Sequence, residues 1–62
     1  MGIDKALTNF SVPYNLVDIS LERAVISIDT AKLVELFYME YDFIIKLRPL
    51  RDKVVIEIKS ID

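Results

Sequence analysis

No cysteine and no histidine occur among the 62 residues of this chain, so it can form no disulfide and no thiolate or imidazole metal site. A domain of this size buries only about 60% of the surface that its unfolded chain exposes. Domains below roughly 70–80 residues usually gain stability from a disulfide, a metal ion or a partner subunit. Association with another chain is the remaining source of stability. We therefore expect the chain to form a homo-oligomer or to dock on a protein partner.

Hydrophobic residues make up 53% of the chain, a high share for a small domain. The two longest apolar stretches are interrupted, residues 6–17 by Pro13 and several polar side chains, residues 36–47 by three charged ones. Neither reaches the ~18–20 charge-poor residues of a membrane span, and no signal-peptide pattern opens the chain. We expect one cytoplasmic domain over residues 1–62 with no membrane association.

Residues 17–22 alternate between apolar and polar side chains, which is typical of a half-buried strand. The alternation then changes phase, and residues 24–29 continue with the opposite parity. Such a change turns every following side chain to the other face unless the chain bends. Residues 21–24 are therefore expected to form either a tight hairpin turn or a bulge in a bent strand, and the sequence leaves both open.

A helix is expected to begin after Asp29, because Ile28 and Leu33 then occupy the two positions of a hydrophobic staple. Its apolar residues extend to Tyr41 and cover an arc about twice as wide as the roughly 100° of an ordinary surface helix. Such a surplus favours an interface, although an ordinary core with the N-terminal segment covering the flanks is the alternative. The predicted interface consists of Leu36, Phe37, Tyr38 and Tyr41.

Residues 42–48 have two interpretations. Their polar positions continue a helical spacing, so the helix could extend to Leu47. The β-branched and aromatic residues at 43–45 and the turn signal at Pro49 favour a β-hairpin with a turn at residues 49–52. We favour the hairpin because its apolar pairs then share one face. Those pairs are Leu47 with Val54, Ile45 with Ile56 and Phe43 with Ile58.

These elements predict an α+β fold of β(β)αββ order, in which a small antiparallel sheet has one helix packed on a face. Residues 4–10 could add one helical turn at the N-terminus, with Ile3, Leu7 and Phe10 on one side.

The net charge of −2 hides an asymmetry. Residues 46–59 carry five cations and two carboxylates, whereas residues 1–45 carry three cations and seven carboxylates. A nucleic-acid-binding or regulatory module would use such a basic hairpin for phosphate contacts. The alternative is an outer sheet face that only keeps the domain soluble. The predicted basic patch consists of Lys46, Arg48, Arg51, Lys53 and Lys59.

We expect no catalytic residue, no metal ligand and no cofactor. Without cysteine and histidine there is no nucleophile–histidine pair. Loops that bind phosphate closely need glycines, and the chain has only Gly2. The carboxylates fall at spacings that bring no two of them together. The expected function is therefore non-enzymatic, with protein–protein interaction preferred over nucleic-acid binding.

Three runs, Ala24 to Tyr38, Asp42 to Leu47 and Asp52 to Ile58, resemble the small D-type accessory proteins of the His-Xaa-Ser peptide-maturation systems. The resemblance covers residues 24–59 and lies in the order of strand, helix ending in an aromatic residue, and β-hairpin. It implies a non-catalytic accessory protein that works beside a peptide-modifying enzyme. No functional residue is carried over by it.

Overall fold

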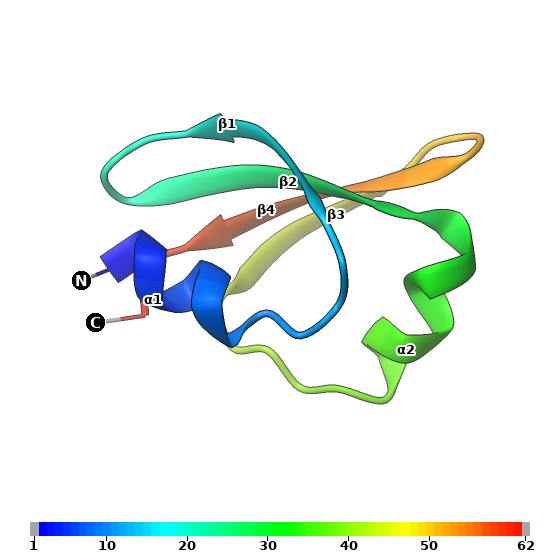
Figure 1. Cartoon of the computed structure of the whole chain (residues 1–62), viewed down its shortest axis with the longest axis horizontal. Coiled ribbons are helices and arrows are strands. Elements are labelled where there is room, and N and C mark those ends of the chain that lie inside the picture. Colours follow the sequence, from blue (N-terminus) through cyan, green and yellow to red (C-terminus); the bar gives the residue numbers. More distant parts are fainter. Residues whose placement is uncertain (1, 62) are drawn as a thin grey trace.

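The computed structural model describes residues 2–61, which form one antiparallel sheet with helices on one face (Figure 1). The elements in chain order are α1 (Gly2–Asn9), β1 (Asn15–Ile19), β2 (Arg23–Asp29), a 3₁₀ turn (Thr30–Lys32), α2 (Leu33–Phe37), β3 (Ile44–Pro49) and β4 (Lys53–Lys59). The strand order is β1-β2-β4-β3, so β1 and β3 are the edges. The predicted α+β class is confirmed, with two α-helices over the described residues where the sequence predicted one.

The core lies between the helices and the inner face of the two central strands. The inner-face pairs of β2 and β4 are Ala24 with Ile58, Ile26 with Ile56 and Ile28 with Val54. All six side chains are buried, and burial of one large aliphatic side chain is worth about 1.5–3 kcal/mol. Ile3 and Ala6 of α1 and Leu36 of α2 belong to the same cluster. The alternating sequence pattern of β2 and β4 therefore builds the floor of the core.

The N-terminal segment forms a full helix, α1, where the sequence predicted a single turn. Ile3, Ala6 and Phe10 are buried, and the Thr8 hydroxyl donates a hydrogen bond to the Asp4 carbonyl oxygen at 2.8 Å. In Figure 1, α1 lies near one end of the sheet and α2 near the other. The N-terminal segment thus covers part of the apolar surface, as the ordinary-core alternative expected.

A turn, together with a separate bulge, resolves the phase change after residue 22. The Ser20 N–H donates to the Arg23 carbonyl oxygen at 2.8 Å, which closes the hairpin between β1 and β2. The hairpin-turn alternative is therefore confirmed. A bulge also occurs, but between Leu16 and Asp18 of β1, outside residues 21–24.

The prediction of a helix up to Tyr41 is wrong, because α2 ends at Phe37. Hydrogen bonds from Tyr38 N–H to Glu35 O and from Met39 N–H to Leu36 O, both 3.2 Å, tighten its last turn in the 3₁₀ manner. The chain then leaves the helix and runs back toward β3. Asp29 precedes the 3₁₀ turn in an extended conformation, but its side chain makes no capping hydrogen bond.

The hairpin of β3 and β4 is confirmed, and its predicted register is wrong by two residues. Leu47 pairs with Ile56, and Leu50 N–H donates to Lys53 O at 2.8 Å across the loop Arg51–Asp52. A shift of two keeps every side chain on its predicted face. Ile45 is the exception. Because of a bulge between residues 44 and 46, it lies on the face opposite to the predicted one, beside outward-facing side chains of β2 and β4.

Candidate interaction surfaces

The structure divides the four predicted interface residues between the core and the surface. Leu36 is buried, with 6% of its surface exposed. Tyr41 is half-buried and packs against the core. Phe37 and Tyr38, by contrast, are 77% and 85% exposed. The four residues do not form one continuous face, because the chain changes direction after Phe37.

Tyr41 is held by contacts within the chain. Its ring centroid lies 5.0 Å from that of Phe10 and 5.2 Å from that of Phe43. Its hydroxyl shares a hydrogen bond of 2.6 Å with the Ser11 hydroxyl and accepts a second one from the Ser11 N–H at 3.2 Å. These contacts tie the loop after α2 to the loop after α1. Tyr41 therefore stabilises the domain itself.

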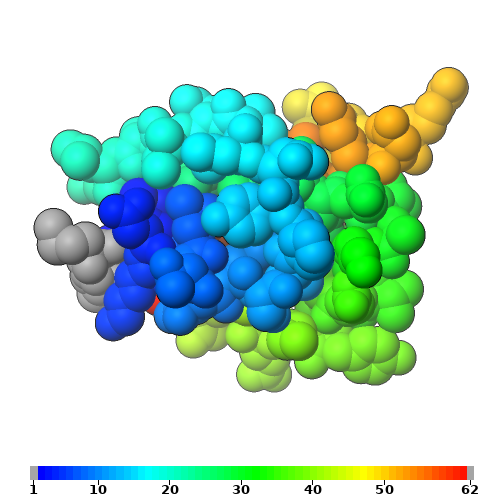
Figure 2. Space-filling view, in the orientation of Figure 1, coloured from blue at the N-terminus to red at the C-terminus, as the bar shows by residue number. Residues whose placement is uncertain are grey.

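Four apolar side chains on α2 and the turn after it remain exposed, and we call them the α2 patch: Val34, Phe37, Tyr38 and Met39. An aromatic side chain has on the order of 200 Å² of surface, so the patch leaves roughly 500 Å² in contact with water. Contiguous apolar patches of about 300–600 Å² are the largest on typical monomers and are often functional. In Figure 2 this segment (green) reaches the surface at the right of the molecule. Val34 and Met39 were not among the four predicted interface residues.

The α2 patch has acidic neighbours. Glu35 precedes Phe37 within α2, and Glu40 directly follows Met39. Glu35 makes an ion pair with Lys32 at 3.5 Å, but both side chains are about half exposed, and exposed pairs of this kind contribute little. Residues 33–42 contain three carboxylates and no cation. The patch therefore lies in an acidic segment of the chain.

The predicted basic patch lies on the outer face of the sheet, opposite to the helices. Strand pairing places Lys46 beside Glu57, Arg48 beside Val55, and Lys59 beside Arg23. Because the inner face is formed by Val54, Ile56 and Ile58, these partners point outward. Lys53 is on the same face, and Arg51 is at the tip of the hairpin, as the sequence predicted.

One ion pair organises this outer face. Arg23 Nη1 lies 3.0 Å from Glu57 Oε2, so the carboxylate that interrupts the basic patch already has a partner in β2. Within residues 2–61, Lys46, Arg48, Lys53 and Lys59 make no ion pair. The centre of the face is a shallow hollow of 110 Å³ lined by Val25 and Val55, with Lys46, Arg48 and Glu57. The outer face is thus a small apolar floor with a basic rim.

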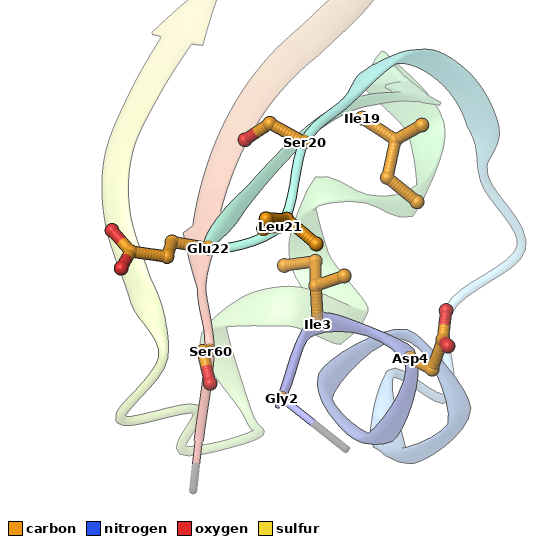
Figure 3. Close-up of a pocket in the computed structure, with 8 residues that line it drawn as sticks. All are labelled: Gly2, Ile3, Asp4, Ile19, Ser20, Leu21, Glu22 and Ser60. Atoms are coloured by element: carbon orange, nitrogen blue, oxygen red, sulfur yellow. The ribbon is translucent and has the colours of Figure 1, made fainter.

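A third feature is an open, mainly apolar groove of 710 Å³ between α1 and the β1–β2 turn (Figure 3). Ile3, Ile19 and Leu21 approach one another there, and Leu21 is 92% exposed. Asp4 of α1 and Glu22 of the β1–β2 turn both line the groove. Across the part of the chain that the structure describes, no three carboxylates gather as a metal site would require.

No helix among residues 2–61 is long and apolar enough to cross a bilayer. No family model, no curated protein and no solved structure matches this chain. The α2 patch and the outer sheet face are therefore the features on which a function is proposed.

Proposed function

We propose that this chain is a non-enzymatic interaction module that self-associates through the α2 patch. The observation that carries the proposal is the exposure of Phe37 and Tyr38, at 77% and 85%, in a domain of 62 residues. Two aromatic side chains side by side in water are costly for a chain that has so little core. Aromatic residues are also the type most enriched at the centres of protein interfaces.

The apolar area of the patch sets the strength of the expected contact. Removal of roughly 500 Å² of apolar surface from water is worth on the order of 12 kcal/mol at about 25 cal/mol per Å². Association costs about 4–15 kcal/mol in lost translational and rotational freedom, and the ordering of side chains adds to this cost. The gain lies within the range of the cost, so the expected contact is of the weak, reversible kind.

The alternative to self-association is docking on a different protein. The resemblance of residues 24–59 to D-type accessory proteins implies docking on a peptide-modifying enzyme. The proposal includes the cytoplasmic location expected from the sequence. Self-association is preferred because the same chain also supplies a surface of opposite charge, the outer sheet face.

Light scattering of matched variants tests the proposal. The double variant Phe37→Ser/Tyr38→Ser removes the two most exposed aromatic side chains, and Leu21→Ser removes an equally exposed apolar side chain at the distant β1–β2 turn. The unaltered chain and the Leu21 variant are expected to exceed 7.2 kDa as concentration rises, and the double variant to stay at 7.2 kDa. Circular dichroism must show that all three are folded. The proposal would be overturned if the mass of all three proteins depended on concentration in the same way.

A second candidate function is binding of nucleic acid on the outer sheet face. The four cations without an ion pair, Lys46, Arg48, Lys53 and Lys59, favour it. Asp18, Asp29 and Glu57 share that face by strand pairing, and none of its paired residues is aromatic. Single-strand binders use aromatic platforms for stacking. Affinity for an oligonucleotide that does not fall with added salt would remove this candidate, because phosphate contacts release counterions.

A further inference from the structure

The outer sheet face has the size to receive the α2 patch. Four strands about 4.8 Å apart, with up to seven residues at about 3.3 Å each, give a face on the order of 400 Å². At the centre of that face, Val25 and Val55 lie half-buried at the floor of the hollow, among Lys46, Arg48 and Glu57. Both helices pack on the opposite face, so the described residues leave this one open (Figure 1).

The charges of the two surfaces are complementary. The outer face carries five cations against three carboxylates, counted from the strand pairing: Arg23, Lys46, Arg48, Lys53 and Lys59 against Asp18, Asp29 and Glu57. The α2 patch lies in residues 33–42, a segment with three carboxylates and no cation. The outer face therefore carries a net positive charge and the segment that contains the patch a net negative charge. Such complementarity favours correct docking and disfavours other arrangements.

A symmetric contact between two α2 patches is less favourable. Across a two-fold axis the same surface meets itself, so Glu35 and Glu40 of both copies would come together at the rim. Lys32 offsets only Glu35, in an exposed pair. Two outer faces in contact would likewise bring Lys46 and Arg48 of both copies together. Like-charge contacts at an interface destabilise it.

Pairing of sheet edges is also disfavoured. In β1 the Asp18 carboxylate accepts a hydrogen bond from the Ile19 N–H at 2.9 Å, and a bulge lies just before it. In β3 the edge carries Lys46, Arg48 and Pro49, and Pro49 has no N–H to donate. Charges, bulges and proline are the devices by which natural sheets avoid edge-to-edge association.

We propose that the α2 patch of one copy docks on the outer sheet face of a second copy, a head-to-tail contact that rests on the self-association proposed above. Phe37 and Tyr38 then cover Val25 and Val55. Lys46 and Arg48 at the rim face the carboxylates and the aromatic rings, and a cation over a ring adds further attraction. Each pair keeps one free surface of each kind, so the assembly grows into a ring or a filament.

Charge reversal in two complementary variants tests this contact. Lys46→Glu/Arg48→Glu makes the outer face acidic, and Glu35→Lys/Glu40→Lys makes the patch rim basic. Each variant alone places like charges in contact, so we expect its association to be at least about tenfold weaker than that of the unaltered chain. An equimolar mixture pairs opposite charges again and is expected to associate. Sedimentation velocity measures all three samples.

The matched control is Lys5→Glu, which changes the net charge by the same amount as the single reversal Lys46→Glu on the outer face. Lys5 is exposed and lies on α1, which packs on the opposite face of the sheet. This variant is expected to associate as the unaltered chain does. Association of the unaltered chain is also expected to weaken between about 50 mM and 500 mM salt, because exposed rim charges are screened.

The outcomes separate the two proposals. If Phe37→Ser/Tyr38→Ser abolishes association but Lys46→Glu/Arg48→Glu does not, the patch docks elsewhere, and only the head-to-tail contact is overturned. If the unaltered chain never associates, both proposals are overturned. A salt-sensitive complex between the outer face and a labelled 20-nucleotide DNA strand, in place of self-association, would also overturn the head-to-tail contact.

Discussion

Tyr38 and Tyr41 are three residues apart, yet they lie in opposite environments. Tyr41 packs against Phe10 and Phe43 and pairs with Ser11, whereas Tyr38 is 85% exposed. The sequence assigned both to one helical face, because the apolar spacing of a helix does not reveal where the chain leaves it. The chain changes direction after Phe37, and this change places Tyr41 against the core and Tyr38 on the surface.

At this scale we predict that Tyr41→Phe lowers the free energy of unfolding by about 1 kcal/mol, the net value of a typical hydrogen bond lost with the Ser11 hydroxyl. Tyr38→Phe is the matched control and is expected to change stability by less than about 0.5 kcal/mol. Urea unfolding followed by circular dichroism measures both. Equal effects of the two substitutions would contradict the role assigned to Tyr41.

At the scale of elements, alternation predicted which faces of β2 and β4 are buried, but it predicted neither the face of Ile45 in β3 nor how β3 and β4 align. A side-chain period of two fixes only parity, and a slip of two residues leaves the faces unchanged. The loop Arg51–Asp52 sets the actual register and has no Asn-Gly or Asp-Gly signal. The predicted length of α2 was also wrong, because contacts of Tyr41 with a distant segment draw the chain out of the helix. Such contacts leave no local pattern in the sequence.

The central position of β4 leads to a second prediction. Ile56 is 0% exposed and pairs with Ile26 on one side and Leu47 on the other. Ile56→Val is expected to cost about 0.5–1.5 kcal/mol of unfolding free energy, from lost burial and a residual cavity. Ile45→Val removes the same methylene from a side chain that is 43% exposed at the β3 bulge, and should cost less. Chemical denaturation at constant m-value compares the two.

At the scale of the whole molecule, the sequence predicted a surplus of apolar surface, and the structure shows where much of it lies. The core takes Leu36 and Tyr41, and α1 covers part of the sheet. Phe37 and Tyr38 remain outside. The sequence could not distinguish the two core residues from the two exposed ones, because no local pattern shows which side chains the N-terminal helix will cover.

Self-association links stability to concentration. If folded copies bind one another and unfolded chains do not, the apparent Tm rises with protein concentration. We predict such a rise for the unaltered chain and for Leu21→Ser, and a Tm independent of concentration for Phe37→Ser/Tyr38→Ser. Scanning calorimetry over a wide concentration range provides the readout. A rise that persists in the double variant would place the contact outside the α2 patch.

The central claim is that the exposed α2 patch of the folded domain is covered by a second copy. Sedimentation equilibrium of the unaltered chain measures this directly, because the mass in solution is read without reference to any variant. We predict a weight-average mass that starts near 7.2 kDa in dilute solution and increases steadily with concentration. A mass that stays at 7.2 kDa up to the highest attainable concentration would contradict the account.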